Sequence, residues 1–291
     1  MKTALNPANQ ANIAPKTAIV CRQIRVDDID AVVRLLARGF PERPLDYWRV
    51  AMSRLRDRET PEGYPRFGYG LFNRDMMVGV LLLIVSRGDD NKLRGNLSSW
   101  CVEPEFRGYS VLLQAAPFRL KDLTLFNISP APNTIRTIEA SGFRRYSTGV
   151  FLAVAGIGGK TPDAVARRMS VELVRSNVRV ARLVDGGCLA FEVDWRGERI
   201  PFAFLPRRAL GGWAPCAHLA YCRSLDDFVA VARPLGRALL KAGYPLIAVD
   251  ATGPIAGLVG RFAHGQPKMY RGMNPPRLGD LSDSEIALFG A

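Results

Sequence analysis

The chain has 291 residues, of which 48% are hydrophobic and 23% are charged. This composition fits a globular chain with enough apolar material for one large or two ordinary domains, and it excludes an intrinsically disordered protein. The formal net charge is +13 and is spread along the sequence, which favours an anionic partner without choosing among nucleotide, acidic protein and nucleic acid.

The predicted elements of residues 19–155 begin with a strand followed by helices and continue with consecutive strands. The expected strands are 18–24, 66–75, 76–88, 93–103, 123–129 and one from 144 onward, and the expected helices start at 28, 44, 110 and 133. Three antiparallel strands therefore precede a strand–helix–strand crossover. This order predicts an α/β (α+β) fold with a mixed, mostly antiparallel sheet flanked by helices.

Residues 156–164 are rich in glycine and are predicted to be a linker between domains. The region 165–291 then repeats much of the first order, although 257–265 reads as a short helix or loop. Its other expected elements are a helix at 164–177, a hairpin at 188–206, a strand at 216–224, a helix at 225–243 and strands at 244–250 and 267–272. We therefore predict a tandem pair of related domains, 19–155 and 165–291, each with a mixed sheet.

The apolar runs, the N-terminal residues and the Cys and His content bear on cellular location and metal binding. Apolar runs stay well below the roughly 18–20 residues that span a bilayer, and residues 1–18 lack the apolar block of a secretory signal and are expected to form a flexible tail. The five Cys are widely spaced and the only His are His218 and His264. We therefore expect no membrane span, no metal site and reduced thiols in a cytoplasmic protein, and we expect both His to be structural.

The segment VEPEFRG (residues 102–108), the helix after it and the later pair Gly142-Phe143 resemble the GNAT acyltransferase superfamily in their order and spacing. The resemblance covers residues 19–155 and implies acetyl-CoA or another acyl-CoA as donor. It places pantetheine between splayed strands, next to the backbone of residues 100–102, and the pyrophosphate on the turn that follows. The implied donor-binding residues are Trp100, Cys101, Val102, Arg107, Gly108, Tyr109 and Ser110.

The physics of this turn agrees with an anion site. A strand that runs into a helix leaves amide groups unpaired and directs the positive end of the helix dipole at whatever lies in front. The sequence also departs from the family, because Ser110 and Leu112 stand where glycines are usual and Ile138 replaces a Tyr that protonates the leaving thiolate. The alternative interpretation of the turn is therefore an ordinary strand-to-helix corner.

Catalytic groups are less well defined by the sequence. Glu103, at the strand end, is the first candidate for general base, and Glu105 in the loop is the second, although both could simply favour the helix dipole. Tyr109 is the first candidate for the acid, with Tyr146 and Cys101 as substitutes. A nucleophilic role for Cys101 is disfavoured, because residues 19–155 contain no His to activate the thiol.

The leading hypothesis is an acyltransferase that moves an acyl group, most simply acetyl, from acyl-CoA to an amine or hydroxyl of an unidentified small-molecule or protein acceptor. An acyl carrier protein could present the thioester, since its acidic surface would suit a basic chain. The alternative is a non-catalytic protein that binds a thioester or a protein partner. Nucleic-acid binding has only the pI of about 10.0 in its favour. Homodimerisation stays open, and the second domain is expected to bind no cofactor and to shape an acceptor pocket at the interface.

Overall fold

The computed structural model describes residues 19–88, 90–159 and 163–290, so the predicted tail at 1–18 lies outside the described residues. We call residues 19–158 the first half and residues 163–290 the second half. The first half contains β1 (Ile19–Gln23), α1 (Ile29–Gly39), α2 (Leu45–Asp57), β2 (Gly68–Asn73), β3 (Met76–Arg87), β4 (Leu93–Val102), α3 (Ser110–Ala115), β5 (Thr124–Asn127), α4 (Ile135–Ala140) and β6 (Arg144–Gly158).

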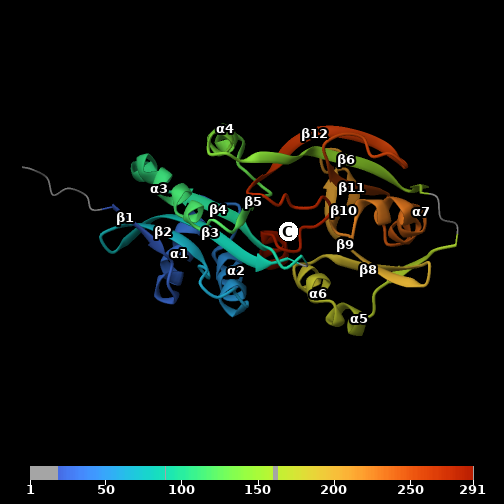
Figure 1. Ribbon diagram of the computed structural model, residues 1–291, viewed down its shortest axis with the longest axis horizontal. Coiled ribbons are helices and arrows are strands. Elements are labelled where there is room, and N and C mark those ends of the chain that lie inside the picture. The colour runs from blue at the N-terminus through green and yellow to red at the C-terminus, as the bar shows by residue number, and fades with distance from the viewer. Residues whose placement is uncertain (1–18, 89, 160–162, 291) are drawn as a thin grey trace, which may run out of the picture.

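The second half repeats this order, except that it has no helix between its last two strands and has an additional helix, α8, after them. It contains β7 (Val165–Arg168), α5 (Val171–Ser176), α6 (Val178–Asp185), β8 (Leu189–Trp195), β9 (Glu198–Ala209), β10 (Ala214–Tyr221), α7 (Leu225–Lys241), β11 (Leu246–Ala251), β12 (Leu258–Arg271) and α8 (Glu285–Phe289). In both halves, helices follow the first strand and a helix joins the fourth and fifth strands. The predicted mixed α/β architecture with tandem related halves is confirmed (Figure 1).

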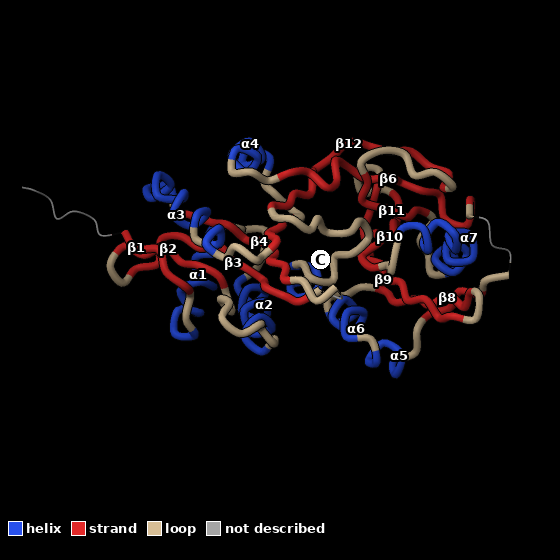
Figure 2. Tube along the Cα trace, in the orientation of Figure 1, coloured by secondary structure: helices blue, strands red, loops and turns tan. Residues whose placement is uncertain are grey.

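The two halves share one 12-stranded sheet, because each inserts its last strand into the other. The strand order is β1-β2-β3-β4-β5-β12-β6-β11-β10-β9-β8-β7. Thus β12 lies between β5 and β6, and β6 lies between β12 and β11, all in antiparallel pairs. The strands run as one continuous layer from end to end (Figure 2). Neither half completes its sheet without a strand from the other.

Two predicted elements of the second half are wrong. The expected helix at 164–177 is instead the strand β7 followed by α5, because residues 165–168 pair with β8 and Ser170 caps the new helix by accepting from the Leu173 amide. The segment 257–265, expected as a short helix or loop, belongs to β12. It pairs closely with β6, where a side chain at Gly260 would meet the carbonyl oxygen of Leu152 at 2.1 Å. A single sequence hides this exchange, because the pairing partner lies about a hundred residues away in the other half.

The predicted linker at 156–164 lies partly outside the described residues, and its first residues continue β6 to Gly158. The limits of the two domains therefore stay a prediction.

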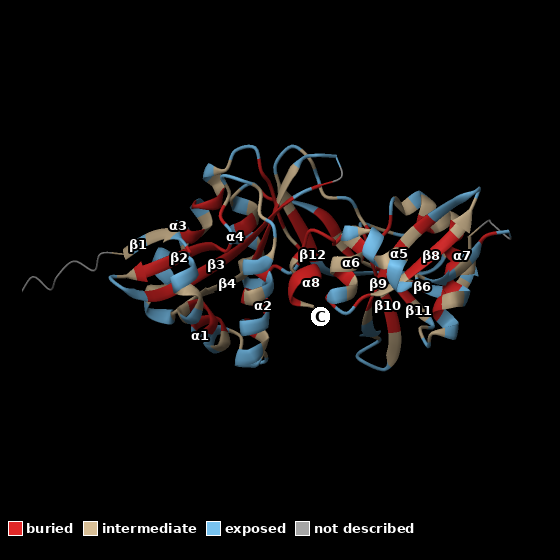
Figure 3. Cartoon of the chain, turned by 90° about the horizontal axis from the view of Figure 1, so that it is seen from below, coloured by how far each residue is buried: buried red, intermediate tan, exposed pale blue. Residues whose placement is uncertain are grey.

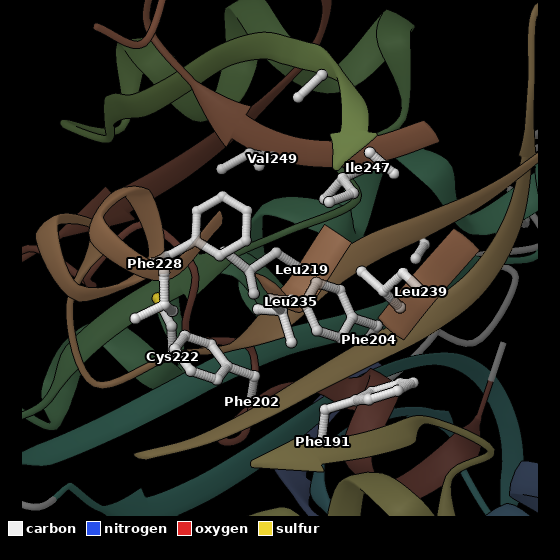
Figure 4. Close-up of a cluster of buried hydrophobic side chains, with 14 of the residues drawn as sticks. Phe191, Phe202, Phe204, Leu219, Cys222, Phe228, Leu235, Leu239, Ile247 and Val249 are labelled. Carbon is white, nitrogen blue, oxygen red and sulfur yellow. The ribbon is translucent and has the colours of Figure 1, made fainter. Parts of the chain in front are cut away.

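Buried residues lie along the strands of the sheet and on the helices packed against it (Figure 3). They form cores on both faces of the sheet, and each core combines residues of the two halves. In the second half, Phe202 and Phe204 of β9 are fully buried against Phe228 of α7, which is itself fully buried (Figure 4). This cluster also contains Phe151 of β6, which the first half contributes. Conversely, the core beneath β3 and β5 includes Met269 of β12, which is 0% exposed. The hydrophobic contribution to stability is therefore shared between the halves.

The contact between α7 and β6 depends on a glycine. A Cβ on Gly236 would lie 2.1 Å from the backbone nitrogen of Gly156. We expect Gly236→Ala to lower the free energy of unfolding by about 1–3 kcal/mol through overpacking, even though alanine favours helices by about 1 kcal/mol. Urea unfolding measures this, with Gly253→Ala as the control, since a Cβ at Gly253 meets open space. Equal stability of both variants would contradict the close approach.

Candidate functional site

The strands β4 and β5 pair only at their beginning and then separate. Their parallel register covers Arg94–Thr124, Gly95–Leu125 and Asn96–Phe126. Beyond Asn96, β4 continues to Val102 with pairing to β3 alone, while β5 ends at Asn127. The rest of β4 therefore has an edge that β5 does not cover, as the resemblance implied.

The turn after β4 is a 3-10 helix, Pro104–Tyr109, that runs directly into α3. Its amides are partly used within the turn, because the Phe106 amide donates to the Glu103 carbonyl and the Ser110 amide donates to the Arg107 carbonyl. Gly108 has space around it and does not adopt a left-handed backbone. A Cβ would fit there, so nothing in the backbone conformation of this turn requires glycine.

A cavity of about 970 Å³ opens beside the uncovered edge of β4 and extends between the two halves. It brings together several residues that the sequence predicted as donor-binding: Trp100, Cys101, Val102, Arg107 and Ser110. The other predicted site residues, Glu103, Gly108 and Tyr109, do not line it.

The candidate acid and base residues of the turn lie outside this cavity. The Glu103 carboxylate accepts a hydrogen bond from Arg38 Nη2 at 2.5 Å, and the exposed fraction of Tyr109 is 42%. Ile138 is buried and lines the cavity wall. Among the substitutes, burial raises the pKa of the Cys101 thiol despite the Arg38 charge, and burial raises the pKa of Tyr146 well above its usual value. Both groups therefore release a proton less readily than a free thiol or phenol does.

The second half, including residues 272–290 after β12 (the C-terminal segment), supplies polar side chains that no sequence motif indicates. The cavity wall includes Arg207 of β9, His218 of β10, Gln266 and Lys268 of β12, and Glu285 of α8. The sequence predicts a structural role for His218, and the other residues belong to no motif. Their elements reach the cavity because β12 crosses into the first half and the C-terminal segment lies in the middle of the molecule (Figure 1).

Glu285 lies at the point where β4 and β5 part. Its Oε1 accepts from Ser129 Oγ at 2.5 Å, and its backbone N–H donates to Asn96 Oδ1 at 2.8 Å. Burial raises the pKa of this carboxyl group, while hydrogen bonds from Ser129 and Ser98 and the charge of Lys268 act in the opposite direction.

A second buried cluster lies next to it. Lys268 Nζ is 3.5 Å from Asp250 Oδ1, and His218 Nε2 is 3.2 Å from the same oxygen. Burial acts to raise the pKa of Asp250, but the neighbouring His218 and Lys268 outweigh it and the pKa is lowered. Asp250 of β11 is therefore held as a carboxylate by two partners, His218 on the adjacent strand β10 and Lys268 on β12, which lies on the far side of β6.

The corresponding opening in the second half is occupied by the chain itself. β10 and β11 pair only up to His218 and Ala248 and then diverge. The C-terminal segment pairs with β10 there: the Leu281 amide donates to the Ala220 carbonyl and the Cys222 amide donates to the Gly279 carbonyl, each at 2.8 Å. At Tyr221 one edge of β10 pairs with Ala203 of β9. The C-terminal segment therefore pairs with the opposite edge, which faces β11.

Other site types find no support in the part of the chain that the structure describes. All five Cys are free thiols, and no group of His, Cys, Asp and Glu within the described residues could hold a metal ion. Burial raises the pKa of Cys188 and Cys222 to about 12, so these thiols are inert. Across residues 19–88, 90–159 and 163–290, no helix combines the length and apolarity needed to cross a membrane.

No protein-family model and no curated protein matches the sequence, but solved structures match the fold. A GCN5-related N-acetyltransferase from Anabaena variabilis matches with a TM-score of 0.58 at 10% identity, covering 87% of this chain and 72% of that chain. One from Kribbella flavida matches with a TM-score of 0.53 at 15% identity, covering 87% and 70%. A protein from Pyrococcus horikoshii, provisionally assigned as an acetyltransferase, matches with a TM-score of 0.51 at 13% identity over 96% of both chains. The chain therefore has the fold of the GCN5-related N-acetyltransferases, as the turn motif had indicated.

Proposed function

We propose that the first half binds the thioester of an acyl-CoA beside β4 and transfers its acyl group to an amine or hydroxyl in the cavity. The observation that supports this most directly is the uncovered edge of β4, which opens into a cavity of about 970 Å³. An extended pantetheine chain can hydrogen-bond to a strand edge as a further strand would. The cavity has room for the acyl group and an acceptor next to it.

The diphosphate of the donor would lie at the turn between β4 and α3. Two amides of this turn are engaged in local hydrogen bonds, so side chains carry more of the binding than in a glycine-rich loop. Arg107 is exposed and Ser110 is half-buried, and both line the cavity. A guanidinium can pair with diphosphate oxygens in a bidentate manner.

Donor binding is tested by titrating the wild-type chain with CoA and with acetyl-CoA. Thermal shift and calorimetry are the two readouts. We expect Arg107→Glu to weaken CoA binding by roughly tenfold or more, which corresponds to about 1.4 kcal/mol, since it replaces an attractive charge with a repulsive one. Arg119→Glu is the control, because Arg119 is an exposed arginine in the same connection between β4 and β5 but does not line the cavity. An unchanged CoA affinity in Arg107→Glu would refute this placement of the diphosphate.

The alternative is a protein that binds a thioester without turnover. It is favoured by the turn after β4, where local hydrogen bonds occupy amides, and by Ile138, which cannot donate a proton. Thiol release from acetyl-CoA with a panel of amines separates the two. Binding of CoA with a flat response across the panel would favour the binder. If an acyl carrier protein that carries an acetyl thioester supports turnover and acetyl-CoA does not, the donor is the carrier protein.

A further inference from the structure

The carboxylate of Glu285 lies where three separate parts of the chain meet. Its neighbours are Ser98 on β4, just beyond the last residue that pairs with β5, and Ser129, just beyond the end of β5. The chain runs to its C-terminal end near the centre of the molecule (Figure 2). This last segment carries Glu285 to both serines, and the Glu285 backbone N–H donates to Asn96 Oδ1. Glu285 is therefore anchored where the two strands diverge, which is the inner end of the proposed donor site.

The position of this carboxylate is not explained by the helix to which it belongs. α8 is capped by Ser284, whose side chain accepts from the Ile286 amide. The Glu285 side chain instead turns away and accepts from Ser129. Protein atoms surround the carboxyl group, and this burial raises its pKa. The residue nevertheless keeps part of its surface accessible and lines the cavity. A carboxylate with a perturbed pKa that lines a cavity is a candidate functional group, because it can contact a ligand bound in that cavity.

We propose that Glu285 is the catalytic base of the first-half site and that it takes the proton of the attacking amine. This inference rests on the proposed acyl transfer. It assigns the base to the second half of the chain and not to Glu103, whose carboxylate is paired with Arg38 away from the cavity.

Acyl transfer at this site forms one bond to nitrogen and breaks one bond to sulfur. The amine nitrogen attacks the thioester carbonyl carbon, the C–N bond forms and the C–S bond breaks. The nitrogen releases one proton to the Glu285 carboxylate, and the CoA sulfur leaves as a thiolate that takes a proton from water. Glu285 then returns its proton to solvent. The products are an amide and CoA, with no change in oxidation state.

The charged and titratable groups around Glu285 set the pH at which it can act. Lys268 on β12 favours its ionised form, and Tyr47 on α2 and Tyr146 on β6 also lie within electrostatic range. Only the ionised carboxylate accepts a proton. Because the pKa is raised, the rate should rise with pH through a limb above the usual Glu value of about 4.3.

The first experiment compares Glu285→Gln with wild type in the full chain. CoA affinity tests the donor site, and thiol release from acetyl-CoA, with water alone and with ethanolamine, putrescine or phenethylamine, tests the chemistry. We expect unchanged CoA affinity, a rate lower by about 10²- to 10⁴-fold, and loss of the pH limb. The control is Glu172→Gln, because Glu172 also lies in the first turn of a short serine-capped helix, but is exposed to solvent.

A spectroscopic measurement adds a readout besides activity. Infrared titration of wild type should show a carboxylic acid that persists above the usual Glu range, and Glu285→Gln should lack it. A full wild-type rate and pH limb in Glu285→Gln, with CoA bound, would overturn the assignment of the base. Absence of CoA binding, or of thiol release with CoA bound, in wild type would overturn the proposed function and with it this inference.

Ser129→Ala supplies a second variant that keeps the carboxylate. The Ser129 hydroxyl donates to Oε1 and so favours the ionised form. Its loss should move the pH limb and the infrared titration to higher pH. If the infrared titration of Glu285 moved to higher pH while the pH limb of the rate stayed where it is in wild type, the limb would belong to another group, and that result would count against Glu285 as the base.

Discussion

Residues 1–158, expressed alone, should fail to fold into a cooperative unit. The sheet of the first half is completed by β12, in which Met269 pairs with Asn127 on β5 and with Arg145 on β6. Met269 is 0% exposed and packs in the core beneath β3 and β5. Without it, β5 and β6 each present an unpaired edge, and β6 also loses its contacts with β11 and α7. Amide dispersion in NMR spectra and thermal unfolding measure the outcome.

The reciprocal fragment, residues 159–291, should fail for the same reason, since Phe151 of β6 belongs to its core. Mixing or co-expressing the two fragments is the positive control, and we expect it to restore a cooperative transition close to that of the intact chain. A dispersed spectrum and a single sharp transition from either fragment alone would show that the exchanged strands are dispensable.

Lys268→Met should lower the free energy of unfolding at neutral pH by about 3–5 kcal/mol, the range found when one partner of a buried ion pair is removed. The side chains of Lys268 and Asp250 are only 10% and 4% exposed, at 3.5 Å. Methionine preserves most of the apolar volume, so the main loss is the charge that compensates Asp250. Urea unfolding at neutral pH measures the change.

The pH dependence of this effect has a definite sign. The folded-state pKa of Asp250 is lowered, so its contribution to stability is present above the unfolded value of about 3.9 and is lost as the pH falls through the folded pKa. Removing Lys268 raises the folded-state pKa. The stability difference between wild type and Lys268→Met should therefore be largest at neutral pH and shrink on acidification.

Two controls test the origin of the effect. Asp250→Asn combined with Lys268→Met should cost less than the sum of the single variants, because the uncompensated charge is gone. Lys92→Met removes an exposed lysine 3.9 Å from Asp90 and should change stability by less than about 1 kcal/mol. A pH-independent loss in Lys268→Met would mean that packing, not charge, is responsible.

Local patterns were sufficient to predict most elements of the first half. The helix of residues 45–57 follows a proline at its N-cap and buries an apolar face, and the hairpin between β2 and β3 turns where Arg74 adopts a positive φ of 54°. Alternating and continuous apolar runs predicted β2, β3 and β4, because their periodicity reports burial directly. The turn motif after β4 indicated the fold that the comparisons confirmed.

Segments whose partners are distant in sequence could not be predicted in this way. β12 contains glycines and few buried positions over its first residues, so its strand character depends on β6. β7 likewise depends on β8, where Arg167 meets Glu192 at 2.7 Å. The local sequence of β12 or of β7 does not reveal either pairing partner.

The sequence by itself determined the tandem order of elements, the mixed sheet and the turn after β4, because helix capping and apolar periodicity are local properties of the chain. Only the tertiary structure decided that the halves exchange strands and that the chain's end fills the opening of the second half. It also brought His218, Lys268 and Glu285 to a cavity beside β4. The physical reason is that strand pairing and buried ion pairs join residues far apart in sequence, and a local pattern does not encode which distant partner each will meet.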